Sequence, residues 1–251
     1  MPIFHKYKCI FIHIPKSAGT SINAALGIGR EGIQSLFGKI TKEEKAKYGL
    51  THTYWHHCPI SLIKPFMPED TFNKYFKFTF LRNPWDRLVS LYLYHKRINR
   101  LDDLGAFNEW ILSKKIPSYL LIPQLDYITD NKGNIIVDFI GRFENMNKDW
   151  KYVTKKIGVN AKLRPANVSK RKHYSSYYTE ETTRVVGELF RKDIETFGYR
   201  FEKAGFSKNR MYDIKHLALF SGERAVLKIK TLLKETFPNL YLKLKKFKEK
   251  L

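Results

Sequence analysis

The stretch 8–23, KCIFIHIPKSAGTSIN, constrains the fold more than any other part of the sequence. Its largely apolar run over 9–14 is typical of a buried β-strand, and Pro15 prevents the strand from continuing. Small and hydroxyl-bearing residues follow at the point where a helix should begin. The stretch therefore predicts a strand, a short loop and a helix, which is the repeating unit of α/β folds.

The loop in this stretch has the composition of an anion site. The start of a helix leaves backbone N–H groups unpaired and carries the positive end of the helix dipole. Gly19 lets the backbone approach an anion closely, and Lys16 adds a mobile positive charge. The loop is not a Walker A motif, because its lysine precedes its only glycine. We expect it to hold a phosphate or sulfate, although ordinary helix capping by Ser17 or Thr20 would also explain its hydroxyl groups.

A second segment has the same order of elements. The alternation of aromatic and polar residues over 75–81 predicts a strand, and the helix that follows has Asn83 at its expected N-cap. Arg82, at the end of the strand, offers a planar donor for a phosphate. The Ser90 hydroxyl, two turns into the helix, can bond the same anion or a nearby lysine. Taken singly, an ion pair at Arg82 or a solvated Ser90 would be the simpler interpretation.

Together the two segments resemble the sulfotransferases that use 3′-phosphoadenosine 5′-phosphosulfate (PAPS). The resemblance is to the carbohydrate branch with a heparan sulfate 2-O-sulfotransferase-like core, bacterial members included. It rests on PKSAGTS at 15–21 and RNPWDRLVSLY at 82–92, and weaker similarity extends over roughly residues 5 to 202. It implies that the first loop grips the 5′-phosphosulfate and the second segment the 3′-phosphate. The donor-binding residues it implies are Lys16, Ser17, Ala18, Gly19, Thr20, Ser21, Arg82 and Ser90.

A basic segment near residue 170 is similar to the late loop with which this family covers the nucleotide. The residues that the resemblance assigns to it are Arg171, Lys172 and Tyr174. A solvated run of charge is the alternative interpretation, which is common in so basic a chain. The sequence YYTEE at 177–181, which follows the segment, is also similar to the family and favours the binding role.

Sulfuryl transfer to an alcohol needs a base for the acceptor hydroxyl, and histidine suits that role near neutral pH. His57 aligns best with the family's histidine, although Cys-Pro-Ile at 58–60 replaces the turn that bacterial relatives carry, and His56 remains the alternative base. Lys16 is expected to stabilise the charge that develops on the leaving phosphate oxygen. A zinc site formed by His52, His56 and Cys58 would lack an evident fourth ligand, so we expect no metal.

The length of 251 residues, 43% of them hydrophobic, is enough for one sizeable domain. We assign residues 1–203 to a sulfotransferase domain of the α/β class, with a P-loop-like three-layer core and a mostly parallel sheet flanked by helices. Residues 204–251 are expected to form a helical C-terminal extension. Its twelve basic and four acidic residues interleave with apolar ones, which predicts basic amphipathic helices. Such helices can lie on an anionic membrane, dock on the core or pair with another subunit.

Other elements follow from local signals. Helices are expected at 41–48, 106–114, 144–157 and 180–197, the third stopped by Gly158 and the fourth capped by Thr179. Two strands are expected around a turn at 130–134.

The predicted function is transfer of a sulfuryl group from PAPS, by in-line displacement, to a hydroxyl of a carbohydrate acceptor, which releases PAP. The acceptor is an oligo- or polysaccharide, with a glycolipid or an acidic glycan among the alternatives. The formal net charge of +22 favours polyanionic partners. A kinase-like phosphoryl transferase and a basic nucleic-acid- or membrane-binding module are the alternatives. The first would need a Walker A loop, and the second would not need two anion loops at strand ends, so no nucleic-acid partner is expected. Two cysteines and no membrane-spanning apolar stretch favour the cytoplasm. Peripheral contact with the inner face of the membrane would follow if the C-terminal extension binds lipid rather than the core or another subunit.

Overall fold

The computed structural model describes residues 3–27, 57, 59–64, 67–98, 105–113, 116, 121–164 and 171–203. A four-stranded sheet runs through this part of the chain in the order β1 (Ile3–Phe4), β2 (Cys9–Ile12), β3 (Phe76–Leu81) and β4 (Phe139–Arg142). The central strands β2, β3 and β4 are parallel, and β1 joins the edge of β2 antiparallel. The expected α/β fold with a mostly parallel sheet flanked by helices is confirmed.

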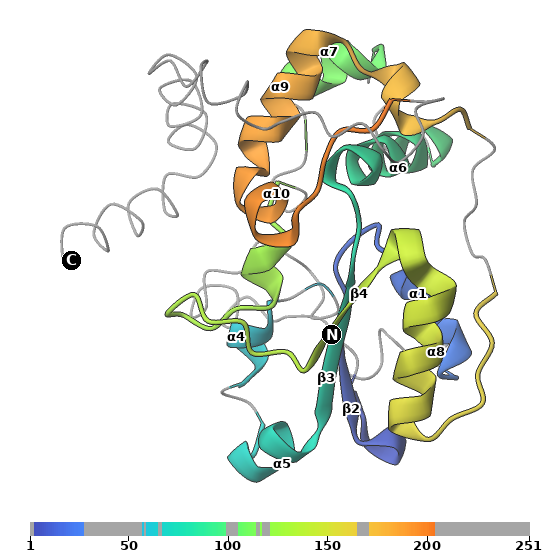
Figure 1. Cartoon of the computed structure of the whole chain (residues 1–251), viewed down its shortest axis with the longest axis vertical. Coiled ribbons are helices and arrows are strands. Elements are labelled where there is room, and N and C mark those ends of the chain that lie inside the picture. Colours follow the sequence, from blue (N-terminus) through green and yellow to red (C-terminus); the bar gives the residue numbers. More distant parts are fainter. Residues whose placement is uncertain are drawn as a thin grey trace.

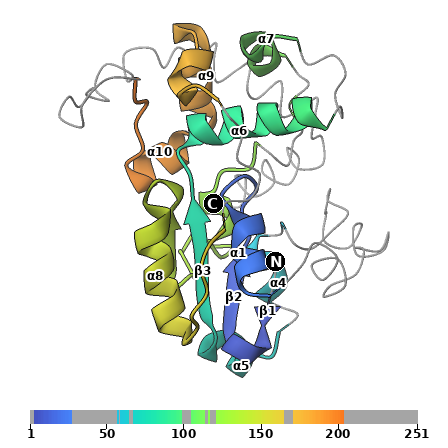
Figure 2. The same cartoon turned by 90° about the vertical axis from the view of Figure 1, so that its right-hand side faces the viewer.

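Helices cover both faces of the sheet and the edge where its parallel strands end. α1 (Gly19–Ala25) and α8 (Met146–Ile157) lie on one face, and α4 (Ile60–Ile63) and α5 (Glu69–Lys74) lie on the other side (Figures 1 and 2). α6 (Pro84–Arg97), α7 (Phe107–Leu112), α9 (Glu180–Leu189) and α10 (Arg191–Phe197) gather beyond the carboxyl end of β3. Short 3₁₀ helices complete the described elements: η1 (His5–Tyr7), η5 (Leu125–Tyr127), η6 (Phe143–Asn145) and η7 (Tyr174–Tyr177).

The alternation of side chains along β2 builds a core on each face. Cys9 and Phe11 pack in a cluster with residues of α1 and α8, whereas Ile10 and Ile12 belong to the larger cluster that includes α6, α7, α9 and α10. All four residues of the strand are buried. This is the pattern of a parallel strand that has helices on both sides, and it accounts for the apolar run in the sequence.

The predicted helix over 180–197 is two helices. Thr179 caps α9 as expected, because its side chain accepts a hydrogen bond from the backbone N–H of Thr182. Phe190 then interrupts the helix with φ −114° and ψ 27°, and its side chain is fully buried. Packing of this ring in the core outweighs the continuous helical pattern of the sequence, and the chain turns there into α10.

Two strands are predicted within 125–143, on either side of the turn at 130–134. The second is confirmed in part as β4, whereas at the turn itself the pairing is one antiparallel bridge, between Thr129 and Ile135. The residues before this bridge form the 3₁₀ helix η5, in which the backbone N–H of Leu125 donates to the carboxylate of Asp193. Only β4 joins the sheet. This correction has a tertiary cause, since Asp193 comes from α10.

The predicted helices over 41–48 and 204–251 lie outside the described residues, so the domain boundary at 203 stays a prediction. The helix predicted after Asn83 and the helix predicted over 106–114 are confirmed as α6 and α7. The helix predicted over 144–157 is confirmed as α8, which begins at Met146 after the 3₁₀ helix η6, and Gly158 ends it in a left-handed conformation. Within the described ranges, no helix is long and apolar enough to span a bilayer.

Candidate functional site

The loop between β2 and α1 has a strained backbone that two arginines hold in place. Lys16 and Ala18 have positive φ angles of 68° and 64°, which non-glycine residues seldom adopt. Arg87 donates from Nε to the carbonyl of Pro15 at 3.1 Å, and Arg82 donates from Nη1 to the carbonyl of Lys16 at 3.0 Å. The second sequence segment therefore fixes the shape of the first, as strained loops require.

The hydroxyl-bearing residues of the loop do not cap α1. Ala18 is the N-cap, and no side chain accepts a hydrogen bond there. The Ser17 side chain is buried, and its hydroxyl has no hydrogen-bond partner in the described part of the chain. Thr20 is half-buried and Ser21 is buried at the start of the helix. The alternative of ordinary capping by Ser17 or Thr20 is therefore wrong.

Gly19 meets the ring of His13. A Cβ at this position would lie 1.8 Å from Nε2 of that imidazole. His13 also stacks on Phe11 at 5.5 Å between ring centroids. The glycine is thus required by a neighbouring ring, whereas the sequence suggested only an approaching anion.

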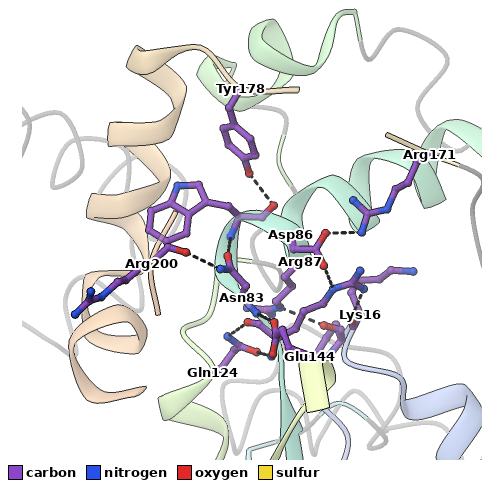
Figure 3. A network of polar contacts seen from close by, with 12 residues as sticks. Lys16, Asn83, Asp86, Arg87, Gln124, Glu144, Arg171, Tyr178 and Arg200 are labelled. Carbon is purple, nitrogen blue, oxygen red and sulfur yellow. Dashed lines mark hydrogen bonds and ion pairs between the residues drawn. The ribbon is translucent and has the colours of Figure 1, made fainter. Parts of the chain in front are cut away.

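Arg82 lies in a network that joins the two sequence segments to the late basic loop (Figure 3). Its Nε donates to Asp86 Oδ2 at 2.8 Å, and its guanidinium lies 3.9 Å from the centroid of the Phe143 ring. Arg171 pairs with the other oxygen of the same Asp86 carboxylate. Asp86 therefore brings Arg82 and Arg171 together beside the Lys16 loop, although these residues are far apart in the sequence.

The side chain of Gln124 holds the backbone of Arg82, and the sequence did not indicate this role. Its side-chain oxygen accepts from the backbone N–H of Arg82 at 2.9 Å, and its amide nitrogen donates to the Arg82 carbonyl at 2.8 Å. The Asp193 carboxylate in turn accepts from the Gln124 backbone at 2.8 Å. No local sequence pattern marks Gln124 or Asp193. Gln124 lies 42 positions from Arg82, and Asp193 lies 69 positions from Gln124.

The first turn of α6 has two further anchors (Figure 3). Asn83 caps the helix as predicted, with its side-chain oxygen accepting from the Trp85 N–H at 3.1 Å. Its side-chain nitrogen donates to the carbonyl of Arg200, and its backbone N–H donates to Glu144 at 2.6 Å. These bonds to Asn83 fix the position of the N-terminus of α6, the helix that carries Ser90.

The Lys16 side chain extends along α6. Its Nζ lies 4.1 Å from the centroid of the Tyr94 ring, which comes one helical turn after Ser90 on the same face. Burial, together with the nearby charges of Arg82 and Arg97, lowers the pKa of Lys16 to about 8. Ser90 is half-exposed. Lys16 thus contacts α6 through Tyr94, and the predicted bond of Ser90 to a lysine stays a prediction.

His57 contacts His13, the residue whose ring packs against Gly19 of the loop. Its Nδ1 lies 2.9 Å from the His13 carbonyl oxygen, and the two rings meet edge to face at 4.4 Å. Because a carbonyl oxygen can only accept, Nδ1 carries a proton, and in the neutral imidazole Nε2 then carries the lone pair. His56, the alternative base, lies outside the described residues.

The late basic segment is divided between buried and exposed side chains. Tyr174 is buried, and its hydroxyl accepts from the backbone N–H of Glu202 at 2.7 Å. Lys172 is exposed. Of the three residues assigned to this segment, Arg171 is the one with a contact to the network, through Asp86.

The described residues include no cluster of three or more His, Cys, Asp or Glu side chains that could hold a metal ion. His52, His56 and Cys58, which the sequence raised as zinc ligands, lie outside the described ranges.

The sequence model of the sulfotransferase family matches residues 1–200, so the chain belongs to the sulfotransferase family. An uncharacterised protein of Archaeoglobus fulgidus is 40% identical over 107 residues, which make up 42% of this chain and 86% of that protein. The crystal structure of mouse sulfotransferase SULT7A1 complexed with PAP aligns with 98% of this chain and 90% of that chain, at 16% identity and a TM-score of 0.35. A TM-score this low adds nothing to the assignment, which rests on the family match.

Proposed function

We propose that this sulfotransferase takes its sulfuryl group from PAPS and transfers it to a hydroxyl of a carbohydrate acceptor, with PAP as the other product. The observation that carries the proposal is the Lys16 loop. It presents an ammonium group on a strained backbone, and arginines of the second segment hold that backbone at Pro15 and Lys16. Such an arrangement suits a multiply charged anionic donor.

Several polar groups beside Lys16 fit a phosphosulfate. The Ser17 hydroxyl is buried and has no hydrogen-bond partner among the described residues. Unpaired buried groups of this kind are costly, so an anion that accepts from them would recover free energy. The backbone N–H groups at the start of α1, at Gly19 and Thr20, are donors of the same kind. We therefore propose that residues 16–21 hold the 5′-phosphosulfate.

We propose that the second segment and the late basic loop bind the 3′-phosphate. Arg82, Ser90, Arg171, Lys172 and Tyr174 are proposed for this side by their resemblance to the family's nucleotide-binding residues. The sharing of Asp86 by Arg82 and Arg171 supports the two arginines, because one carboxylate leaves their combined charge positive. Tyr174 would act through the packing of the loop, since its hydroxyl is already bonded to Glu202.

The chain's own residues suffice for the transfer step. Nε2 of His57 would take the proton of the acceptor hydroxyl while the acceptor oxygen forms a bond to sulfur. The bond between sulfur and the leaving phosphate oxygen breaks, and the Lys16 ammonium would stabilise the charge that grows on that oxygen. No metal is required by this scheme. The carbohydrate acceptor is supported by the resemblance to the carbohydrate branch, and the net charge of +22 suits an acidic one.

Calorimetry with PAP and with ATP, both without divalent ions, tests the donor. PAP should bind, and its affinity should weaken with salt because the contacts are ionic. Adenosine 5′-phosphosulfate, which lacks the 3′-phosphate, should bind more weakly. Equal affinity for the two nucleotides would contradict the assignment of Arg82 and Ser90. Transfer of labelled sulfate from PAPS to a panel of neutral and acidic oligosaccharides then tests the acceptor.

A further inference from the structure

The ammonium of Lys16 rests on an aromatic ring. Its Nζ lies 4.1 Å from the centroid of Tyr94, well inside the distance of about 6 Å at which a ring face attracts a cation. Among the described residues, no carboxylate forms an ion pair with Lys16. Within the described part of the chain, the ring of Tyr94 is thus a group that partly offsets the burial of this charge.

The backbone from which this side chain extends is fixed. The carbonyls of Pro15 and Lys16 accept from Arg87 and Arg82, at 3.1 and 3.0 Å. Arg87, Ser90 and Tyr94 follow one another at helical spacing along the face of α6 that borders the loop. The Lys16 side chain thus runs along α6, past the level of Ser90, to the Tyr94 ring.

We propose that Tyr94 is a positioning residue for Lys16: its ring holds the ammonium along α6 in the donor-free protein and yields it when the anionic leaving group enters the loop. The inference rests on the proposed function, because the second half of it presupposes PAPS. A ring suits this purpose better than a carboxylate. It attracts the cation, but less strongly than phosphate oxygens do, and it carries no net charge that would repel the donor.

The charged groups that face Lys16 oppose its protonation. Arg82 from the end of β3 and Arg97 from the last turn of α6 both repel the ammonium, and with burial they lower the pKa of Lys16 to about 8. Arg97 lies 5.7 Å from the centroid of the same Tyr94 ring. If the ring holds the ammonium, replacing it with an aliphatic side chain must lower the pKa further. Removing the charge of Arg97 must raise it.

The titration of Lys16 in the donor-free protein tests the first half. It can be followed by NMR in protein labelled at its lysines, with the Lys16 signal identified as the one lost in Lys16→Arg. We expect a midpoint near 8 in the wild type. Tyr94→Leu should lower the midpoint by roughly half a unit to one unit, whereas Tyr94→Phe, which keeps the ring, should leave it within about 0.3 units. Arg97→Gln is the control of opposite sign and should raise the midpoint.

The same titration with saturating PAP tests the second half. The midpoints of the wild type and Tyr94→Leu should converge at a higher pH, because the ammonium now faces the product phosphate in both. In turnover, Tyr94→Leu should raise kcat/KM for the donor several-fold at pH 7 and leave kcat within about twofold, because the ring stabilises the ammonium in the free enzyme and that stabilisation is lost when the donor binds.

Two results would overturn the inference. One is an unchanged midpoint in donor-free Tyr94→Leu, or an equal fall in Tyr94→Phe. The other is an undiminished difference between the wild type and Tyr94→Leu when PAP is bound, which would mean that the ring never yields the ammonium. Failure of the wild type to bind PAP is a separate result. It would overturn the proposed function and the yielding of the ammonium, while a ring-dependent midpoint in donor-free protein would still establish the holding role of Tyr94.

Discussion

At the scale of single residues, the close contact between Gly19 and the His13 ring leaves no room for a side chain at position 19. A methyl group at position 19 would lie 1.8 Å from Nε2 and 1.9 Å from Cδ2 of the imidazole, far inside van der Waals contact. His13 cannot move freely, because it is buried and its carbonyl binds His57. The donor loop and the proposed base are therefore linked through one ring.

We predict that Gly19→Ala destabilises the protein by about 1–3 kcal/mol and weakens PAP binding, because His13 must shift. Gly187→Ala is the matched control. It lies within α9, where the nearest atom to an added Cβ is Trp85 Cζ2 at 3.6 Å, so alanine should stabilise that helix by about 0.5–1 kcal/mol. Thermal unfolding and calorimetry measure both effects. A Gly19→Ala protein that melts at or above the wild-type temperature would contradict the prediction.

We predict that the buried ammonium of Lys16 lowers the stability of the folded protein but is needed for turnover. Its pKa is lowered to about 8 in the folded protein from an ordinary value of 10.5, so the folded state binds this proton more weakly than the unfolded state does. The resulting penalty is present in full below pH 8 and disappears as the pH rises through 10.5. Lys16→Met should therefore raise stability at pH 7 by about 1 kcal/mol, a figure reduced for partial solvation. Turnover should fall by orders of magnitude.

Urea unfolding of the wild type and Lys16→Met at pH 7 and pH 10 measures this destabilisation. The difference between the two proteins should shrink at the higher pH. Lower stability of Lys16→Met at pH 7 would mean that the ammonium is not penalised in the folded protein.

At the scale of elements, the junction between β3 and α6 depends on Gln124. This side chain is fully buried and pairs with both backbone groups of Arg82, the residue that leads from the strand into the helix. Gln124→Leu would leave the N–H and the carbonyl of Arg82 unsatisfied. We predict a loss of about 2–4 kcal/mol of stability and a weaker affinity for PAP.

Thr154→Ala is the control for this prediction, since it removes a hydroxyl bonded to the Lys151 carbonyl at the surface of α8. That change should stay within about 0.5 kcal/mol. Denaturant unfolding together with PAP calorimetry distinguishes the two variants. Unchanged PAP affinity in a folded Gln124→Leu protein would show that the junction does not position the donor site.

At the scale of the whole molecule, residues 1–203 contain every group proposed for the chemistry. The segment 204–251 adds a surplus of eight positive charges and an amphipathic pattern, which suit an anionic membrane surface or a second subunit. We propose that it is an accessory to the sulfotransferase domain.

Truncation after Lys203 should therefore preserve PAP binding and the turnover of a soluble acceptor. The truncated protein should lose binding to anionic liposomes, or lose dimerisation, whichever the segment provides, and it can also become less soluble if apolar surface is uncovered. Liposome sedimentation and light scattering measure these properties. Loss of PAP binding in a truncated protein that still unfolds cooperatively would place the segment in the site.

The sequence by itself determined the elements whose signals are local. The strand, loop and helix over 8–23 follow from an apolar run, a proline and a set of small residues. Asn83, Gly158 and Thr179 marked helix ends correctly, because a cap is made between residues only a few positions apart. The same text carried the family resemblance, and the match to the sulfotransferase family confirms it at that level.

The tertiary structure alone decided which side chains meet. Phe190 breaks a continuous helical pattern because its ring is buried, and Asp193 binds the backbone N–H of Leu125 in a segment that the sequence predicts to be a strand. Gln124, His13 and Tyr94 became part of the site only when the chain brought them to Arg82, Gly19 and Lys16. Such contacts join residues tens of positions apart, and no local pattern of hydrophobicity or capping encodes them. They depend on how the helices pack around the sheet, which is a property of the whole fold.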